Sequence, residues 1–194
     1  MKKQTVFIHV PKTGGASILQ ICQRYGIRIV DHNLRNPEHR SLAQIKEQTP
    51  DIFSFAIVRN PWDRVVSAYH FLKNGGIKGD DKLDADRFVS GYGSFDEFVL
   101  EGFKDKEILD QIHFRPQYKW ISDDVEVIAD MVGRFEKLQL HFSRWCKMIG
   151  LPSYKLEHIN RSMHKPYKAY YSAQTIELVR EIYSKDIELF KYNF

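Results

Sequence analysis

Six residues near the N-terminus combine glycines, hydroxyls and a lysine in a spacing that suits anion binding. They are Lys12, Thr13, Gly14, Gly15, Ala16 and Ser17. The apolar run at 6–10 before them predicts a buried parallel strand, which Pro11 ends, and a helix is expected after the glycines. Glycines permit a tight turn close to a ligand, and the N–H groups at a helix start attract anions. We therefore predict a phosphate or sulfate site here; the alternative is a plain strand–turn–helix junction with a surface lysine.

A similar pattern recurs at residues 58–69, VRNPWDRVVSAY. Arg59 lies where an apolar strand is expected to end, and ligands of parallel sheets bind beyond that end. Arg64 and Ser67 are one helical turn apart, and the planar fork of an arginine suits a phosphate. The alternative is a helix start in which Arg64 pairs with a local acid. Two such sites in one small protein predict a ligand with two separated phosphate groups.

The elements that would position these residues alternate between strands and helices. Strands are predicted at 6–10, 27–30, 52–58, 125–128 and 131–135. Helices are predicted at 16–25, 41–48, 62–72, 95–99 and 138–149, and one or two helices at 173–190. Apolar strands separated by helices indicate an α/β fold with a parallel sheet. Residues 73–93, rich in glycine, lysine and aspartate, predict a long loop that acts either as a lid or as a solvated surface.

Length and composition indicate one globular domain spanning residues 1–194, with 43% hydrophobic and 28% charged residues. The formal net charge of +4 suits an anionic ligand, whereas the scattered lysines and arginines do not predict nucleic-acid binding. No run reaches transmembrane length and no signal peptide is recognisable, so we expect a cytoplasmic, bacterial protein without stable membrane insertion. Cys22 and Cys146 are predicted to be buried free thiols, with a disulfide as the alternative.

Residues 7–17 (FIHVPKTGGAS) and 55–69 (FAIVRNPWDRVVSAY) together resemble motifs of the carbohydrate sulfotransferases that use 3′-phosphoadenosine-5′-phosphosulfate (PAPS). The resemblance implies a three-layer α/β fold with a mainly parallel central sheet and helices on both faces, the P-loop-like sulfotransferase fold. It also implies that Lys12 contacts the bridging oxygen and the 5′-phosphosulfate. The residues from Thr13 to Ser17 would line the phosphate.

The second motif resembles the 3′-phosphate site of the same family, which assigns Arg59 and Ser67 to that phosphate. Arg161 lies in a loosely matching stretch that returns to the nucleotide. Residues 113–117 (HFRPQ) are similar to a segment near the acceptor. Three residues of this segment are therefore candidate acceptor-binding residues: His113, Arg115 and Gln117.

Sulfuryl transfer from PAPS to a carbohydrate hydroxyl needs a stabilised leaving phosphate, an in-line hydroxyl group and a base. Lys12 and the N–H groups of its turn are predicted to stabilise the phosphate. His32, in the polar loop after the strand at 27–30, is predicted to be the base because imidazole titrates near neutral pH. An exposed loop histidine is the alternative, and His113 is the second candidate. Two carboxylates are further candidates: Glu136 and Asp63.

The sequence leaves two other functions open. The first is a small ATP-dependent kinase. The usual triphosphate loop has its lysine after the glycines, whereas Lys12 precedes Gly14, and Arg59 with Ser67 also counts against a kinase. The second is a non-catalytic module that binds anionic glycans or nucleotides. No metal requirement is predicted, since Lys12 and the arginines supply positive charge, and His9 is expected to be a satisfied, buried histidine inside the first strand.

Overall fold

Two compact units make up the part of the chain that the computed structural model describes, residues 4–30, 42–77, 79–123, 125–156 and 165–194. Unit 1 comprises Met1–Arg59 and Gln117–Asn160, and unit 2 comprises Asn60–Pro116 and Arg161–Phe194. The chain therefore leaves unit 1 after Arg59 and re-enters it at Gln117. That the two units act as one domain over residues 1–194 stays a prediction.

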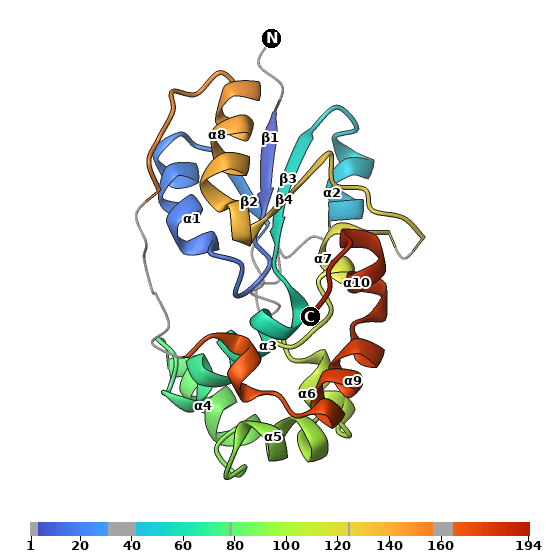
Figure 1. Ribbon diagram of the computed structural model, residues 1–194. Coiled ribbons are helices and arrows are strands. Elements are labelled where there is room, and N and C mark those ends of the chain that lie inside the picture. The colour runs from blue at the N-terminus through green and yellow to red at the C-terminus, as the bar shows by residue number, and fades with distance from the viewer. Residues whose placement is uncertain (1–3, 31–41, 78, 124, 157–164) are drawn as a thin grey trace. The chain divides into compact units, whose positions relative to one another are not determined.

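Unit 1 is built on a four-stranded sheet in which all neighbouring strands are parallel (Figure 1). In spatial order the strands are β2 (Arg28–Val30), β1 (Thr5–Ile8), β3 (Phe53–Val58) and β4 (Met131–Arg134). Ile8 pairs with Val30 and with Ala56, and Val58 pairs with Arg134. The carboxyl ends of the strands therefore share one edge, and the segments after β1 and β3 leave the sheet there.

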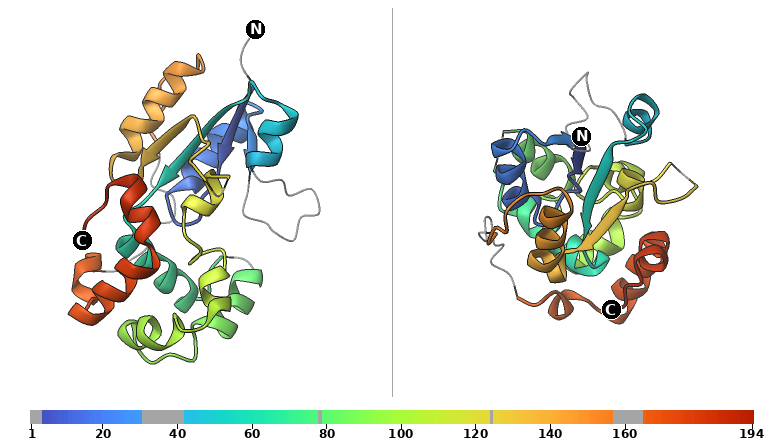
Figure 2. Two further views of the ribbon diagram at one scale, coloured as in Figure 1. Left: turned by 90° about the vertical axis from the view of Figure 1, so that its right-hand side faces the viewer. Right: turned by 90° about the horizontal axis from the view of Figure 1, so that it is seen from above.

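Helices cover both faces of this sheet, as Figure 1 and Figure 2 show: α1 (Gly15–Arg24) and α8 (Leu138–Met148) on one face and α2 (Leu42–Gln48) on the other. Side chains alternate along a strand, so Phe7 and Phe55 both face α1 and α8. Trp145 of α8 stacks on Phe55 with 4.7 Å between ring centroids. The three-layer α/β architecture predicted from the sequence is thus confirmed.

Hydrogen bonds to Asp130 join the starts of β3 and β4 on the α2 side of the sheet. Its carboxylate accepts bonds from the backbone N–H of Ser54 at 2.8 Å, from the Ser54 hydroxyl, and from Lys46 Nζ of α2 at 2.9 Å. Partial burial by itself raises the pKa of Asp130, but the bonds from Ser54 and Lys46 outweigh it, and the pKa lies below its usual value. Two shorter elements complete unit 1: α7 (Tyr118–Ile121) and η2 (Phe135–Lys137).

Unit 2 is helical and packs around an aromatic core. Its elements are α3 (Pro61–Lys73), α4 (Gly79–Phe88), α5 (Phe95–Glu97), η1 (Phe98–Gly102), α6 (Lys106–Asp110), η3 (Tyr167–Tyr170), α9 (Ala173–Ile182) and α10 (Ser184–Phe190). The Asn60 side chain caps α3 by accepting a bond from the Trp62 N–H at 3.1 Å, and Pro61 occupies the first helical position. Trp62 and Phe98 are buried in the core of this unit. Among the described helices, none has the length and apolar character needed to cross a membrane.

Two local predictions are wrong. The expected long loop at 73–93 contains α4, whose first turn carries Asp80 and Asp81 and therefore complements the positive end of the helix. The helix was not predicted because it carries many charged residues and Ala85 is its only buried residue. The strand expected at 125–128 is replaced by a turn with a single bridge between Ser122 and Val127, because the Asp123 carboxylate accepts backbone N–H bonds inside the turn.

Candidate functional site

A glycine turn joins β1 to α1 in unit 1 and contains the first set of predicted anion-binding residues. β1 ends at Ile8, and α1 begins at Gly15. Between them the backbone is left-handed at Lys12, with φ 67°, and at Gly14, with φ 79°. Such backbone in a turn directs neighbouring N–H groups into a concavity that can hold an anion. The turn therefore lies where the sequence predicts it and has a shape suited to that ligand class.

Close packing behind the turn requires both glycines. A β-carbon on Gly14 would lie 3.0 Å from side-chain carbons of Leu138 and Phe135, at a φ that already disfavours side chains. A β-carbon on Gly15 would lie 2.1 Å from Cδ2 of His9. His9 follows β1 and is half-buried, which corrects the expectation of a fully buried residue inside the strand. Its imidazole is what fills the space beside Gly15.

The hydroxyl groups of the turn have different surroundings. Thr13 is fully buried, and its Oγ1 donates to the carbonyl of Val10 at 2.8 Å, which braces the turn. Ser17 is 8% exposed and belongs to the first turn of α1. Gly14 caps this helix without a side-chain hydrogen bond, and the first turn carries no acidic residue. The first turn of α1 itself therefore supplies no carboxylate that would compete with an anion at the positive end of the helix.

Arg59 follows the last residue of β3 and is held at several points within unit 1. Its backbone N–H donates to Oε1 of Gln117, and its carbonyl accepts from Nε2 of the same amide, both at 2.8 Å. Its Nη1 donates to the carbonyl of Lys12 at 3.1 Å, and its guanidinium carbon lies 4.2 Å from the centre of the Phe135 ring. One arginine therefore connects the end of β3 with the turn after β1.

The residues of the second predicted anion site belong to two different units, which the sequence did not predict. Arg59 belongs to unit 1, whereas Ser67 belongs to unit 2, where it is 3% exposed on α3. Arg64 is fully buried in unit 2, and its Nη1 donates to the carbonyl of Arg115 at 3.0 Å. That Arg64 also belongs to a ligand-facing helix surface stays a prediction. Its observed contact supports the segment that contains Arg115.

His113 is 4% exposed and is fixed by its neighbour Gln111 in unit 2. The Gln111 Oε1 accepts from the His113 backbone N–H at 2.7 Å, and the Gln111 Nε2 lies 3.0 Å from His113 Nδ1. The same Nε2 donates to Asp84 at 3.1 Å, which assigns it as the nitrogen of the amide. An amide nitrogen only donates, so Nδ1 of His113 accepts, and a neutral His113 carries its proton on Nε2.

Sequence reasoning missed two buried residues near the C-terminus: Tyr183, which lies between α9 and α10, and Asp186 of α10. Tyr183 is 1% exposed, and its hydroxyl donates to the carbonyl of Phe114 at 2.5 Å. Asp186 is fully buried. Burial raises the pKa of Tyr183, Arg64 opposes this rise, and Asp186 adds to it. The bond of Tyr183 gave no sequence signal, because its partner carbonyl at Phe114 is distant along the chain.

Two predicted residues, His32 and Arg161, lie outside the described residues. Within the described ranges, no group of three His, Cys, Asp or Glu side chains is placed to hold a metal ion.

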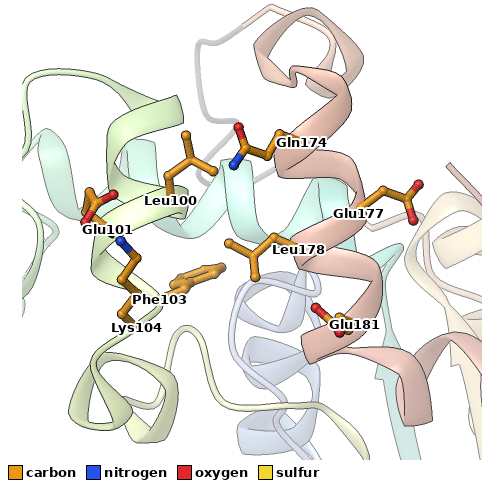
Figure 3. Close-up of a pocket in the computed structure, with 8 residues that line it drawn as sticks. All are labelled: Leu100, Glu101, Phe103, Lys104, Gln174, Glu177, Leu178 and Glu181. Carbon is orange, nitrogen blue, oxygen red and sulfur yellow. Dashed lines mark hydrogen bonds and ion pairs between the residues drawn. The ribbon is translucent and has the colours of Figure 1, made fainter.

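A pocket of about 410 Å³ lies in unit 2 between η1 and α9 (Figure 3). Its apolar lining comes from Leu100, Phe103 and Leu178. The polar residues that line it are Glu101, Lys104, Gln174, Glu177 and Glu181. The predicted site residues within the described ranges do not line this pocket. Three carboxylates at its border would repel a phosphate or sulfate, so the pocket is a poor candidate for the anion site.

Comparison with known families decides the class of the protein. The model of the sulfotransferase family matches residues 2–193. The chain belongs to the sulfotransferase family. The family and the α/β fold together support sulfotransferase activity, the transfer of a sulfuryl group.

Two individual proteins are similar to this sulfotransferase. An uncharacterized protein of Archaeoglobus fulgidus is 33% identical over 115 residues, which cover 59% of this chain and 81% of that protein. The crystal structure of a sulfotransferase from Alicyclobacillus acidocaldarius matches 98% of this chain and 95% of that chain, with 12% identity and a TM-score of 0.44.

Both cysteines of the sulfotransferase are buried free thiols, as predicted. Burial, together with the neighbouring Cys146, raises the pKa of Cys22 to about 12. Burial raises the pKa of Cys146 to about 11. Both thiols therefore stay protonated near neutral pH.

Proposed function

We propose that this protein transfers the sulfuryl group of PAPS to a hydroxyl group of a carbohydrate-type acceptor. The observation that carries the proposal is the bond from Arg59 Nη1 to the carbonyl of Lys12. It connects the two segments that the sequence assigns to two separate phosphates of one ligand. The carbohydrate class of the acceptor rests on the resemblance of the two motifs to carbohydrate sulfotransferases.

The residues around the glycine turn suit the donor in charge and in hydrogen-bonding capacity. Lys12, the backbone of residues 13–17 and the hydroxyl of Ser17 would hold the 5′-phosphosulfate. Arg59, Ser67 and Arg161 would hold the 3′-phosphate and the nucleotide. When bound, PAPS supplies an activated sulfuryl group on a phosphate leaving group. Lys12 and the N–H groups at the start of α1 would stabilise negative charge as it develops on that phosphate.

His32 is the base in this proposal and takes the proton of the acceptor hydroxyl. The geometry of His113 supports this choice over the second candidate. Gln111 occupies the lone pair of His113 Nδ1, and the proton of the neutral ring lies on Nε2, so His113 in this state has no basic nitrogen for the acceptor. His113, Arg115 and Gln117 remain proposed contacts to the acceptor region, and Gln117 receives a further role below.

The direct test is transfer of labelled sulfate from PAPS to a panel of carbohydrate acceptors. We expect labelled product with the wild-type chain and a loss of about 10²- to 10³-fold in kcat for Lys12→Ala, the size typical of removing one donor to a developing anion. Lys104→Ala is the matched control, because Lys104 is an exposed lysine paired with Glu101 in unit 2. His32→Ala should lower kcat by about 10²- to 10⁴-fold.

Three results would contradict the proposal. Phosphate transfer from ATP with magnesium, in place of sulfate transfer, would favour the kinase alternative. Donor binding without turnover on any acceptor would favour a non-catalytic module. A Lys12→Ala variant as active as wild type would remove the turn from the mechanism. A His32→Ala variant of unchanged rate would reject His32 as the base and leave the donor assignment standing.

A further inference from the structure

Arg59 is the first residue after the end of β3, and it is buried. The last register pair of β3 and β4 joins Val58 and Arg134, and Arg59 comes directly after it. Arg59 is 8% exposed, and buried backbone groups need hydrogen-bond partners. The side-chain amide of Gln117 supplies both, with its Oε1 accepting from the Arg59 N–H and its Nε2 donating to the Arg59 carbonyl, each at 2.8 Å. The amide thus replaces a neighbouring peptide group and extends the ladder by one residue.

We propose that Gln117 is a positioning residue that fixes Arg59 and, through it, the donor turn at Lys12; this inference rests on the proposed function of that turn. Gln117 is fully buried, and both ends of its amide are directed at the backbone of one residue. A pair of antiparallel hydrogen bonds restricts rotation of the Arg59 backbone about both of its soft dihedral angles. This role concerns donor binding and is separate from the acceptor contact expected from the sequence.

The Arg59 side chain carries this constraint to the donor turn. Its guanidinium lies over the Phe135 ring, and its Nη1 reaches the Lys12 carbonyl at 3.1 Å. Lys12 has a left-handed backbone with φ 67°, a conformation that is unfavourable for a non-glycine residue. The bond from Arg59 helps to hold this conformation. A shift of the Arg59 backbone would therefore change the position of the guanidinium and loosen the turn.

Substitution of Gln117 separates this role from simple packing. In the Gln117→Glu variant, the introduced carboxylate still accepts from the Arg59 N–H, but when ionised it places a negative charge against the Arg59 carbonyl. Burial raises the pKa of such a carboxyl group, and the protonated form can donate to the carbonyl again. Gln117→Ala removes both bonds and serves as the second variant.

Gln139→Glu is the matched control. Gln139 makes the same kind of double contact in unit 1, donating to the carbonyl of Tyr154 at 2.7 Å and accepting from the Leu156 N–H at 2.8 Å. Its partners do not include Arg59. Because Gln139 is exposed whereas Gln117 is fully buried, this control reports how a glutamate affects the backbone hydrogen bonds without the added effect of burying a charge.

The first readout is hydrogen exchange of the Arg59 backbone amide, measured by NMR on the full chain without ligand. We expect slow exchange in wild type and in Gln139→Glu, and an increase of about tenfold or more in both Gln117 variants, since local opening sets the exchange rate. Fast exchange of this amide in wild type, or equal exchange in wild type and the Gln117 variants, would overturn the proposal. If Gln117→Ala fails to fold, fast exchange in wild type or unchanged exchange in Gln117→Glu would still overturn the proposal.

The second readout is the affinity for 3′-phosphoadenosine 5′-phosphate (PAP), the desulfated donor. Loss of a buried hydrogen bond predicts about tenfold weaker binding by Gln117→Glu near neutral pH. Relative to wild type at the same pH, this deficit should shrink as the pH falls through the pKa of the introduced carboxyl. A deficit independent of pH in Gln117→Glu, or unchanged affinity in both variants, would overturn the proposal. If wild type itself binds no PAP, the proposed function fails, while the exchange data still report on the hydrogen bonds between Gln117 and Arg59.

Discussion

The contact between Gly15 and His9 gives the sharpest test of the glycine turn. In the Gly15→Ala variant the new β-carbon would lie 2.1 Å from Cδ2 and 2.4 Å from Nε2 of His9. Carbon atoms in contact are normally 3.5–4.0 Å apart, so the imidazole must move by roughly 1.5 Å. Such overpacking costs about 1–3 kcal/mol. An alanine at a helical φ regains about 0.4–1 kcal/mol through the unfolded state, which leaves a net loss of about 1–2 kcal/mol.

A double-mutant cycle assigns that loss to His9. In a His9→Ala background the obstructing ring is gone, and Gly15→Ala should be neutral or stabilising by up to about 1 kcal/mol. The coupling between the two positions should therefore reach about 2 kcal/mol, which is within the range for residues in direct contact. Urea unfolding of the four proteins measures this coupling.

Gly79→Ala is the control for the cycle. Gly79 is also the first residue of a helix, α4, and no atom lies within 4 Å of a β-carbon placed on it. We expect this change to stabilise the protein by about 0.4–1 kcal/mol. The reasoning is refuted if Gly15→Ala destabilises both backgrounds equally, or if it stabilises wild type as Gly79→Ala does.

Three further predictions concern stability and reactivity. Tyr183→Phe leaves the Phe114 carbonyl buried without its donor and should cost about 1–3 kcal/mol in urea unfolding, whereas an unchanged midpoint would show that the bond is dispensable. The pKa of Asp130 is lowered in the folded state, so its contribution is present above the usual value of 3.8 and is lost as the pH falls through the folded pKa. Asp130→Asn should therefore flatten the loss of stability in acid, and an acid profile equal to that of wild type would contradict this. The folded pKa values of Cys22, about 12, and of Cys146, about 11, lie above the ordinary 9.0, so both thiols should resist alkylation by iodoacetamide at pH 8 and react fully in denaturant.

Most of the sheet in unit 1 was predictable because its signals are local. The apolar residues of β1 and β3 form continuous runs, and Gly14 with Gly15 marks the turn between strand and helix. Continuous apolar strands are typical of sheets covered on both faces, and the structure has this arrangement. The helix α4 was missed because its polar residues resemble a loop.

The contacts that organise the candidate site could not be predicted from the sequence. Gln117 and Arg59 are 58 residues apart along the chain, and no local pattern indicates that one side-chain amide bonds both backbone groups of the other residue. That the segment HFRPQ lies near the acceptor stays a prediction. The bonds from Arg64 and Tyr183 to the carbonyls of Arg115 and Phe114 in this segment could not be predicted, because only the fold brings these residues together.

The central claim is that the turn after β1 and Arg59 after β3 bind one ligand with two phosphates. Calorimetric titration of the full chain with PAP, adenosine 5′-phosphate and ATP with magnesium tests it most directly. The account predicts saturable binding of PAP that is at least about tenfold tighter than binding of adenosine 5′-phosphate, because the 3′-phosphate adds charge-assisted hydrogen bonds. It also predicts no preference for ATP with magnesium. Equal affinity for PAP and adenosine 5′-phosphate, or tighter binding of ATP with magnesium, would contradict it.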